Sequence, residues 1–155
     1  MKPRDATRIE CATANDAAEI AELYLASRTD ALPFLRRVHS DAETRRWIAD
    51  TLLATRETWI ARSGGSIVGV LALQGEDLDQ LYLLPGWYRR GIGSLMLAKA
   101  KELSPTRLTL FTFQRNARAR AFYEAHGFHI VEMGDGTGNE EGEPAILYEW
   151  RPNRG

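Results

Sequence analysis

The sequence is short of cysteine, histidine and long apolar runs, and each shortage argues against a class of protein. Its one cysteine, Cys11, rules out a disulfide within the chain. With only three scattered histidines beside it, zinc binding has little support, and we expect no bound metal. No apolar run approaches the ~20 residues that span a bilayer, and the first residues lack the apolar core of a signal peptide. We therefore expect a cytoplasmic protein that does not associate with membranes.

An excess of charge of either sign is also lacking. The chain has 20 Lys and Arg residues against 21 Asp and Glu residues, which gives a formal net charge of −1. Nonspecific nucleic-acid binding requires a basic surface, so we expect no nucleic-acid partner. The contents of 44% hydrophobic and 26% charged residues are typical of a soluble globular protein. A length of 155 residues suits one domain, and we predict a single domain over residues 1–155.

Hydrophobic periodicity, helix caps and turn residues predict the element order β-α-α-β-β-β-α-β-α-β-β. Asp16 and Glu19 have capping-box spacing at the start of the first helix, as Ser40 and Glu43 have at the start of the second. The pair Gly64-Gly65 predicts a tight hairpin turn. The predicted strands are 7–13, a hairpin within 57–75, 78–84, 107–113, 128–133 and 145–150, and the predicted helices are 15–28, one that begins after Ser40, 91–103 and 116–128.

The middle of the chain predicts how the strands are connected. Strand 78–84, helix 91–103 and strand 107–113 form a βαβ unit, whose two strands should be parallel with a right-handed crossover. The other neighbouring strands are expected to be antiparallel. The sequence therefore predicts an α+β fold with one mixed, mostly antiparallel sheet, a central parallel βαβ unit and helices on both faces.

The turn between strand 78–84 and the next helix combines cations with bare backbone, in the order Arg89-Arg90-Gly91-Ile92-Gly93. A helix start offers unpaired N–H groups and a partial positive charge, which together bind anions. Glycine lets a ligand approach the backbone, and arginine adds charge-assisted hydrogen bonds to phosphate. We favour a phosphate-bearing ligand at Arg89–Ser94. On these residues alone, an ordinary turn with two solvated arginines is the alternative.

Two segments together resemble the GNAT family of N-acetyltransferases. The turn is similar to the family's acetyl-CoA-binding motif, Arg/Gln-x-x-Gly-x-Gly/Ala: Gly91 and Gly93 match, whereas Tyr88 stands at the leading Arg/Gln. The segment "NARARAFYEAHGF" is similar to the family's Asn-x-x-Ala-x-x-Phe-Tyr-x-x-x-Gly-Phe helix. Its matching residues are Asn116, Ala119, Phe122, Tyr123, Gly127 and Phe128. With the order of elements, the resemblance covers residues 7–150.

The resemblance implies acetyl-CoA as cosubstrate and a role for each motif. On strand 78–84, backbone groups of Leu81 and Leu83 would pair with the pantetheine arm, and one N–H group would hold the tetrahedral oxyanion. Asn116 would bond the pantetheine, and Tyr123 would protonate the departing CoA thiolate. A tyrosine beside Phe122 on a helix could instead serve only the core. The implied cofactor-binding set is Leu81, Tyr82, Leu83, Tyr88, Arg89, Arg90, Gly91, Ile92, Gly93, Ser94, Asn116 and Tyr123.

The base that deprotonates the acceptor amine is left open by the sequence. We take three residues as substrate-side candidates: Asp79 on the central strand, His39 beside the irregular segment 31–39, and Glu141 in the loop 135–144. Each of them alone could be a solvated surface group. The further carboxylates in the preceding turn and in the same loop are Glu76, Asp77, Asp135, Glu140 and Glu143.

The function predicted on these grounds is transfer of an acetyl group from acetyl-CoA to a primary amine of a small molecule, peptide or protein. Transfer of another acyl group and a non-catalytic acyl-CoA-binding or sensing domain are the alternatives. Tyr148 and Trp150 on the last strand could pack inward or line the contact of a homodimer.

Overall fold

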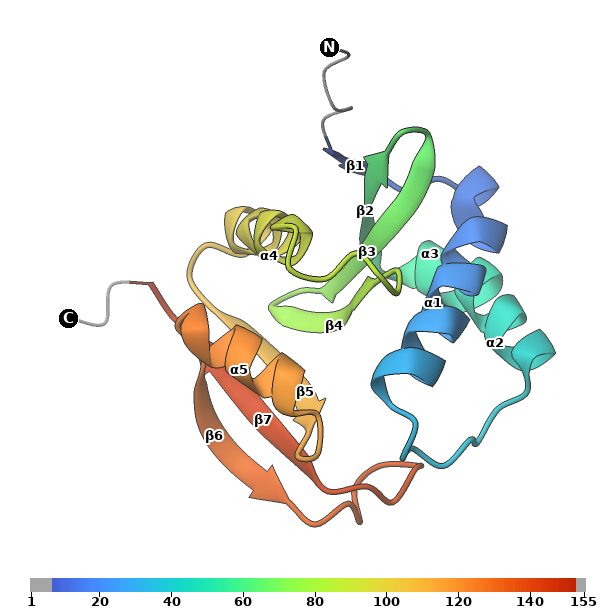
Figure 1. The fold of residues 1–155 in the computed structure, drawn as a ribbon. Helices are drawn as coiled ribbons and strands as arrows, with labels where there is room; N and C mark the ends of the chain where they lie inside the picture. Colours follow the sequence, from blue (N-terminus) through green and yellow to red (C-terminus); the bar gives the residue numbers. More distant parts are fainter. Residues whose placement is uncertain (1–6, 153–155) are drawn as a thin grey trace.

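One twisted sheet organises the chain, in a computed structural model that describes residues 7–152 (Figure 1). Its seven strands lie in the order β1-β2-β3-β4-β5-β7-β6. The strands are β1 (Arg8–Cys11), β2 (Glu57–Ser63), β3 (Ser66–Gln74), β4 (Asp77–Leu83), β5 (Leu108–Phe113), β6 (His129–Gly134) and β7 (Ala145–Trp150). The helices are η1 (Ala14–Asp16), α1 (Ala17–Ala31), α2 (Asp41–Trp47), η2 (Ile48–Leu52), α3 (Leu53–Thr55), α4 (Ile92–Leu103) and α5 (Ala117–Ala125).

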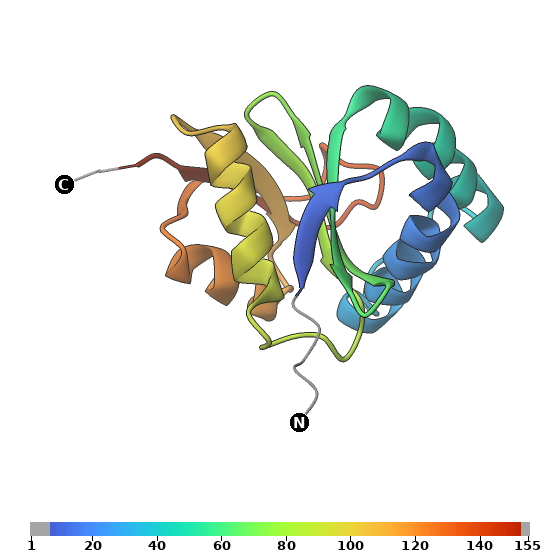
Figure 2. The ribbon, with the colours of Figure 1, turned by 90° about the horizontal axis from the view of Figure 1, so that it is seen from above.

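The pairing of the strands confirms the predicted fold class. Strands β4 and β5, which flank α4, are parallel, and every other neighbouring pair is antiparallel. Helices α4 and α5 cover one face of the sheet, and α1 and α2 cover the other (Figure 2). Within residues 7–152, no helix is long and apolar enough to cross a membrane.

Each face of the sheet has its own hydrophobic core. Under α4 and α5, the core includes the fully buried Met96, Leu97 and Tyr148. Under α1, it includes the fully buried Ile20 and Ile48. Alternate residues of a strand point to opposite faces, so β4 contributes to both cores and is the central element of the molecule.

The aromatic residues of β7 pack inward. The hydroxyl of Tyr148 donates a hydrogen bond to the Glu124 carboxylate over 2.6 Å, and the ring is fully buried. The ammonium of Lys101 lies 4.8 Å from the centroid of the Trp150 ring. The structure thus favours the inward alternative for both side chains, and the homodimer stays a prediction.

The start of the first helix differs from the prediction. The capping box joins Thr13 to Asp16, one turn earlier than expected, and the Asp16 carboxylate accepts from the Thr13 N–H over 2.8 Å. Glu19 is not part of a cap, because its carboxylate accepts a 2.8 Å hydrogen bond from the Ile67 N–H of β3. The predicted Asp16–Glu19 box is therefore wrong: a tertiary contact with the sheet takes Glu19 away from the helix end.

Other local signals are confirmed. Ser40 accepts from the Glu43 N–H over 3.1 Å and Glu43 accepts from the Ser40 N–H over 3.0 Å, which completes the second capping box. In the β2–β3 turn, Gly64 and Gly65 have φ of 57° and 84°. Positive φ at both positions is what a two-residue type I′ hairpin turn requires.

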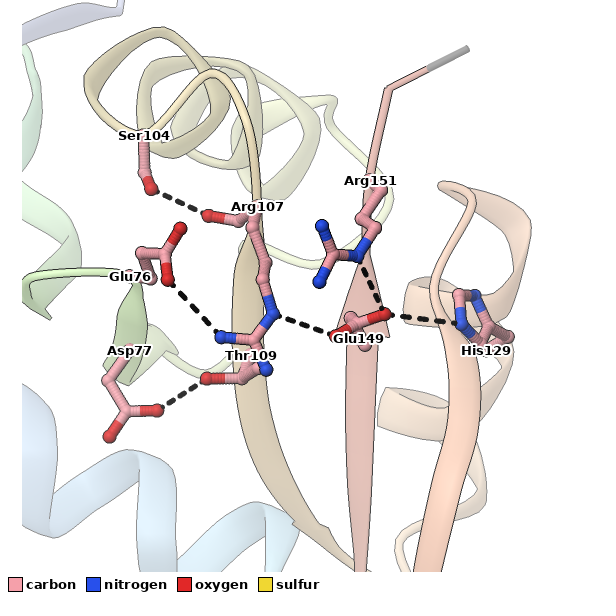
Figure 3. Close-up of polar contacts among 8 residues, drawn as sticks. All are labelled: Glu76, Asp77, Ser104, Arg107, Thr109, His129, Glu149 and Arg151. Atoms are coloured by element: carbon pink, nitrogen blue, oxygen red, sulfur yellow. Dashed lines mark hydrogen bonds and ion pairs between the residues drawn. The ribbon is translucent and has the colours of Figure 1, made fainter. Parts of the chain in front are cut away.

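The parallel pair β4–β5 is joined at one end only. Asp77 and Thr109 are its single registered pair, and the strands separate beyond them (Figure 1). Polar side chains reinforce this end (Figure 3): the Thr109 hydroxyl donates to Asp77 over 2.6 Å, and Arg107 donates to Glu149 over 2.7 Å and to Glu76 over 3.2 Å. We call these five residues the β4–β5 clamp. The clamp holds one end of the sheet closed while the other end is open.

Candidate active site

A cleft of about 490 Å³ lies where β4 and β5 separate. Its wall is formed by β4, by the turn before α4, by α5 as far as Tyr123 with the two residues before this helix, and by the C-terminal end of α1. The cleft therefore has an end that faces the start of α4 and an end that faces α1, with the exposed edge of β4 between them.

The backbone of β4 offers hydrogen-bonding groups to the cleft. The Leu84 N–H donates to the Val68 carbonyl of β3 over 2.9 Å. In an antiparallel ladder such contacts alternate along the strand, so the backbone of Tyr82 also faces β3. The N–H groups of Leu81 and Leu83 therefore face β5, where the cleft lies. Tyr82 lines the cleft as well, but its backbone is engaged with β3.

The turn before α4 is shaped by three residues with left-handed backbone conformations. The φ angles are 89° at Gly86, 63° at Arg89 and 79° at Gly91, and Arg89 is the one non-glycine residue with positive φ in the described part of the chain. Gly91 is the N-cap of α4, and no atom lies within 4 Å of the place where its Cβ would be. The first turn of α4 thus begins beside the cleft with free N–H groups, as an anion site requires.

Gly93 is small for a different reason from the one expected. A Cβ on this residue would lie 3.2 Å from two ring carbons of Phe122 and 3.7 Å from a methyl carbon of Leu83. The glycine lets α4 pack closely against α5 and β4. Ligand access through a missing side chain, the reason predicted from the sequence, describes Gly91 better than Gly93.

The remaining turn residues divide between the cleft and the protein. Tyr88, Arg89 and Ser94 line the cleft. The Arg90 guanidinium instead lies 4.6 Å from the centroid of the Trp87 ring, and Arg90 does not contribute to the cleft wall. Ile92 is buried in the core at 2% exposure. The Arg90 side chain therefore does not face the cleft, and Ile92, the first residue of α4, could offer only its backbone to a ligand.

Tyr123 and Asn116 both line the cleft from α5. Burial raises the pKa of Tyr123, so its phenol keeps its proton at neutral pH. Phe122 and Phe128 pack edge-on against its ring at centroid distances of 5.2 Å and 5.5 Å. Asn116 is the N-cap of α5 and accepts from the Ala119 N–H over 3.2 Å, which leaves its amide nitrogen for a ligand.

The three predicted substrate-side residues do not line the cleft. Asp79 lies on β4 but forms an ion pair with Arg56 over 3.2 Å. Glu76 and Asp77, the other carboxylates near the central strand, belong to the β4–β5 clamp at the closed end of the sheet. The structure therefore keeps the carboxylates of Asp79, Glu76 and Asp77 away from the cleft.

His39 and Glu141 lie outside the cleft wall, in the segment after α1 and in the loop before β7. His39 Nε2 is 3.0 Å from a carboxylate oxygen of Glu140, across 101 positions of sequence. The Glu141 carboxylate is 4.0 Å from the Arg28 guanidinium of α1, and burial raises the pKa of Glu141. The segment after α1 and the loop before β7 are thus brought together (Figure 1).

Three charged residues of the cleft wall were missed from the sequence, namely Asp30, Arg115 and Arg118. Asp30, in the last turn of α1, is exposed and is the one carboxylate that lines the cleft, and no partner for it is found within residues 7–152. Arg118 lines the cleft from the first turn of α5. The predicted first helix ended at residue 28, before Asp30, and this is why the sequence did not indicate it.

The described part of the chain has no cluster of side chains arranged to bind a metal ion. No group of three or more His, Cys, Asp or Glu side chains is placed there to hold a metal ion. Cys11 is free and exposed. The reactive and polar groups of the cleft wall include backbone N–H groups, the tyrosines Tyr82, Tyr88 and Tyr123, arginines and one carboxylate.

Known proteins are similar to this chain in sequence and in fold. The family model of the acetyltransferase (GNAT) domain matches residues 54–130. The peptidyl-lysine N-acetyltransferase YiaC of Escherichia coli is 32% identical over 114 residues, which cover 73% of this chain and 77% of YiaC. The apo form of YjaB from Escherichia coli has a TM-score of 0.78 at 20% identity, covering 94% of this chain and 97% of YjaB. The structure of yncA from Salmonella typhimurium with its cofactor acetyl-CoA has a TM-score of 0.74 at 14% identity, covering 97% and 96%.

Proposed function

This chain belongs to the GNAT acetyltransferase family, and we propose that it transfers an acetyl group from acetyl-CoA to a primary amine. The observation that carries the proposal is the opened β4–β5 pair, with the N–H groups of Leu81 and Leu83 facing a cleft that ends at the anion-binding start of α4. An acyl thioester on a long arm that ends in phosphates fits such a cleft.

The cosubstrate binds through the turn and the edge of β4. The pyrophosphate lies against Arg89–Ser94, where backbone N–H groups and the positive end of α4 meet. The pantetheine arm follows β4 and takes the place of the missing strand partner. Asn116 donates to this arm from the start of α5. These assignments follow from the resemblance to the family, and the positions of Arg89, Ser94 and Asn116 in the cleft wall support them.

The reaction needs three groups from the protein: a donor to the oxyanion, an acid for the leaving thiolate and a base for the amine. The amine nitrogen attacks the thioester carbon, and the carbonyl oxygen becomes an oxyanion, to which the N–H of Leu81 or Leu83 donates. The carbon–sulfur bond then breaks, and the thiolate leaves with the electron pair. Tyr123 donates its proton to this sulfur, because its neutral phenol lines the same cleft.

The acceptor approaches from the α1 end. An amine is a cation at neutral pH, and it must lose a proton before it can attack. Asp30 is the carboxylate of the cleft wall, and no cation pairs with it within residues 7–152, so we assign to it the attraction and deprotonation of the amine. YiaC is named a peptidyl-lysine N-acetyltransferase, and we favour the side-chain amine of a peptide lysine as the acceptor here.

Two measurements test this function. Thermal melts with acetyl-CoA at 100 times its Kd should show a stabilisation of ~2.7 kcal/mol, and no shift at millimolar ligand contradicts acetyl-CoA binding. Release of free thiol with a panel of lysine peptides and small amines should then show turnover. Stabilisation without thiol release from any amine would favour a sensing domain, and faster release from another acyl-CoA would favour a different acyl group.

A further inference from the structure

Tyr88 stands where the family's motif has Arg or Gln, and its surroundings show what it does instead. The Tyr88 side chain lines the cleft beside the turn. Its hydroxyl oxygen is buried and has no hydrogen-bond partner among the described residues. A tyrosine retained for its hydroxyl would have a partner, because an unpaired buried hydroxyl costs stability. The ring of Tyr88, and not its hydroxyl, is therefore the part that makes a specific contact.

The ring of Tyr88 holds an arginine. The guanidinium carbon of Arg118 lies 4.2 Å from the ring centroid, which is a close cation–π contact. Arg118 also lines the cleft, and no carboxylate pairs with it within residues 7–152. Arg115, three residues earlier, differs in this respect because its guanidinium makes two 2.8 Å hydrogen bonds to the Glu143 carboxylate.

We propose that Arg118, oriented by the ring of Tyr88, is the side chain that binds the pyrophosphate of acetyl-CoA in this chain. The inference rests on the proposed function. The motif's missing cation at position 88 is supplied from α5, so Tyr88 is a positioning residue and Arg118 a binding residue. A planar guanidinium binds phosphate oxygens through two parallel hydrogen bonds, and stacking on a ring fixes its plane before the ligand arrives. Arg89 supplies a second cation from the turn itself.

The test is calorimetric binding of two ligands, CoA and dephospho-CoA, which share the pyrophosphate and differ in the 3′-phosphate. Arg118→Ala should weaken both by a similar factor of about ten to a hundred, the value of a charge-assisted bidentate contact. Arg46→Ala is the matched control, because Arg46 is exposed on α2 and outside the cleft, and it should bind as the wild type does. Both variants remove an exposed helical arginine, and circular dichroism confirms that they fold.

Variants at position 88 separate the ring from the hydroxyl. Tyr88→Phe should keep CoA affinity within about twofold, since the ring remains, whereas Tyr88→Ala should weaken it about two- to fivefold. Adding Tyr88→Arg to the Arg118→Ala variant should restore part of the affinity, since the double variant has the family's motif residue.

Three outcomes would overturn the inference. Wild-type affinity in Arg118→Ala removes the binding role, and a loss confined to CoA assigns Arg118 to the 3′-phosphate instead. A large loss in Tyr88→Phe makes the hydroxyl, not the ring, the functional group. If the wild type itself binds neither ligand, the proposed function fails as well, so the two failures are distinguishable.

Discussion

The Thr109 hydroxyl donates a 2.6 Å hydrogen bond to the Asp77 carboxylate at the single registered pair of β4 and β5. The contact lies where the parallel strands meet, and the cleft begins where they part. A sheet that is open at one end depends on its closed end for integrity. The β4–β5 clamp therefore supports the functional site without lining it, and its removal should affect stability before chemistry.

Thr109→Val tests this dependence. Valine keeps the shape of threonine and its preference for strands but loses the hydrogen bond, so the free energy of unfolding should fall by about 1 kcal/mol. For a chain of this size, this corresponds to a drop in Tm of roughly 2–4 °C. Thr106→Val is the control, because Thr106 is exposed just before β5, and it should leave Tm unchanged. Equal effects of the two substitutions would contradict the clamp.

Gly91 gives a test of the turn. Its φ is 79° and the space around its missing Cβ is empty, so a substitution meets backbone strain and no clash. Gly91→Ala should lower the free energy of unfolding by about 1 kcal/mol, and Gly91→Asn by less, because asparagine tolerates the left-handed region. Gly138→Ala is the matched control, since its Cβ would also meet open space without a positive φ. Urea denaturation gives the comparison, and a stabilising Gly91→Ala would refute the strain.

Local sequence signals predicted most of the fold, because turns and caps depend on residues close in sequence. Gly64-Gly65 and the Ser40–Glu43 box are such cases, and the structure has both. The predicted Asp16–Glu19 capping box failed because a backbone N–H of β3, 48 positions away, donates to the Glu19 carboxylate. Rules based on residues close in sequence cannot predict a hydrogen bond to such a distant strand.

The candidate site was predicted unevenly for the same reason. Gly91 and Tyr123 were identified through motifs, and the structure places both at the cleft. Asp30 was missed because α1 continues to Ala31, beyond the end predicted for it. Arg118 was missed because its contact with Tyr88 joins the starts of two helices that are far apart in sequence. Residues whose roles arise from tertiary contacts need the fold before they can be found.

Tyr123→Phe should remove the general acid while leaving the cleft intact. We expect turnover to fall about a hundredfold or more, with acetyl-CoA affinity unchanged, because only the proton donor is lost. Burial raises the pKa of Tyr123 above its usual value of about 10, so the wild-type phenol stays protonated across the neutral and mildly alkaline range. Thiol release between about pH 6 and 10 checks this. Undiminished turnover of the variant throughout that range would assign Tyr123 to packing alone.

Asp30→Asn should weaken the use of the acceptor amine without changing the binding of acetyl-CoA. Loss of the carboxylate should raise the KM for a lysine peptide about tenfold, equivalent to 1.4 kcal/mol, and leave the Kd of acetyl-CoA unchanged. Added salt should raise the wild-type KM, because an exposed charge pair is screened, but should have less effect on the variant. Asp50→Asn, at an exposed position of η2 outside the cleft, is the control. A parallel rise of KM in both variants would indicate a general effect of net charge.

Two glutamates should give opposite pH dependences of stability, and Glu149 is the first. Hydrogen bonds from Arg107 and then Arg151 lower the pKa of Glu149, and His129 lies 3.7 Å away (Figure 3). A lowered folded-state pKa stabilises the fold above the unfolded-state value of about 4.3, and this stabilisation is lost as the pH falls. Glu149→Gln should therefore lower Tm at neutral pH, and its difference from the wild type should shrink in acid.

Glu141 is the second, with the opposite sign. Burial raises its pKa despite the nearby Arg28 guanidinium, so the fold favours the protonated form. That contribution is complete below about pH 4.3 and is lost as the pH rises through the folded-state pKa. Glu141→Gln should therefore raise Tm at neutral pH and leave it unchanged in acid. Thermal melts of both variants across this pH range are the measurement. A lower Tm for Glu141→Gln at neutral pH would show that its pairing with Arg28 outweighs its burial.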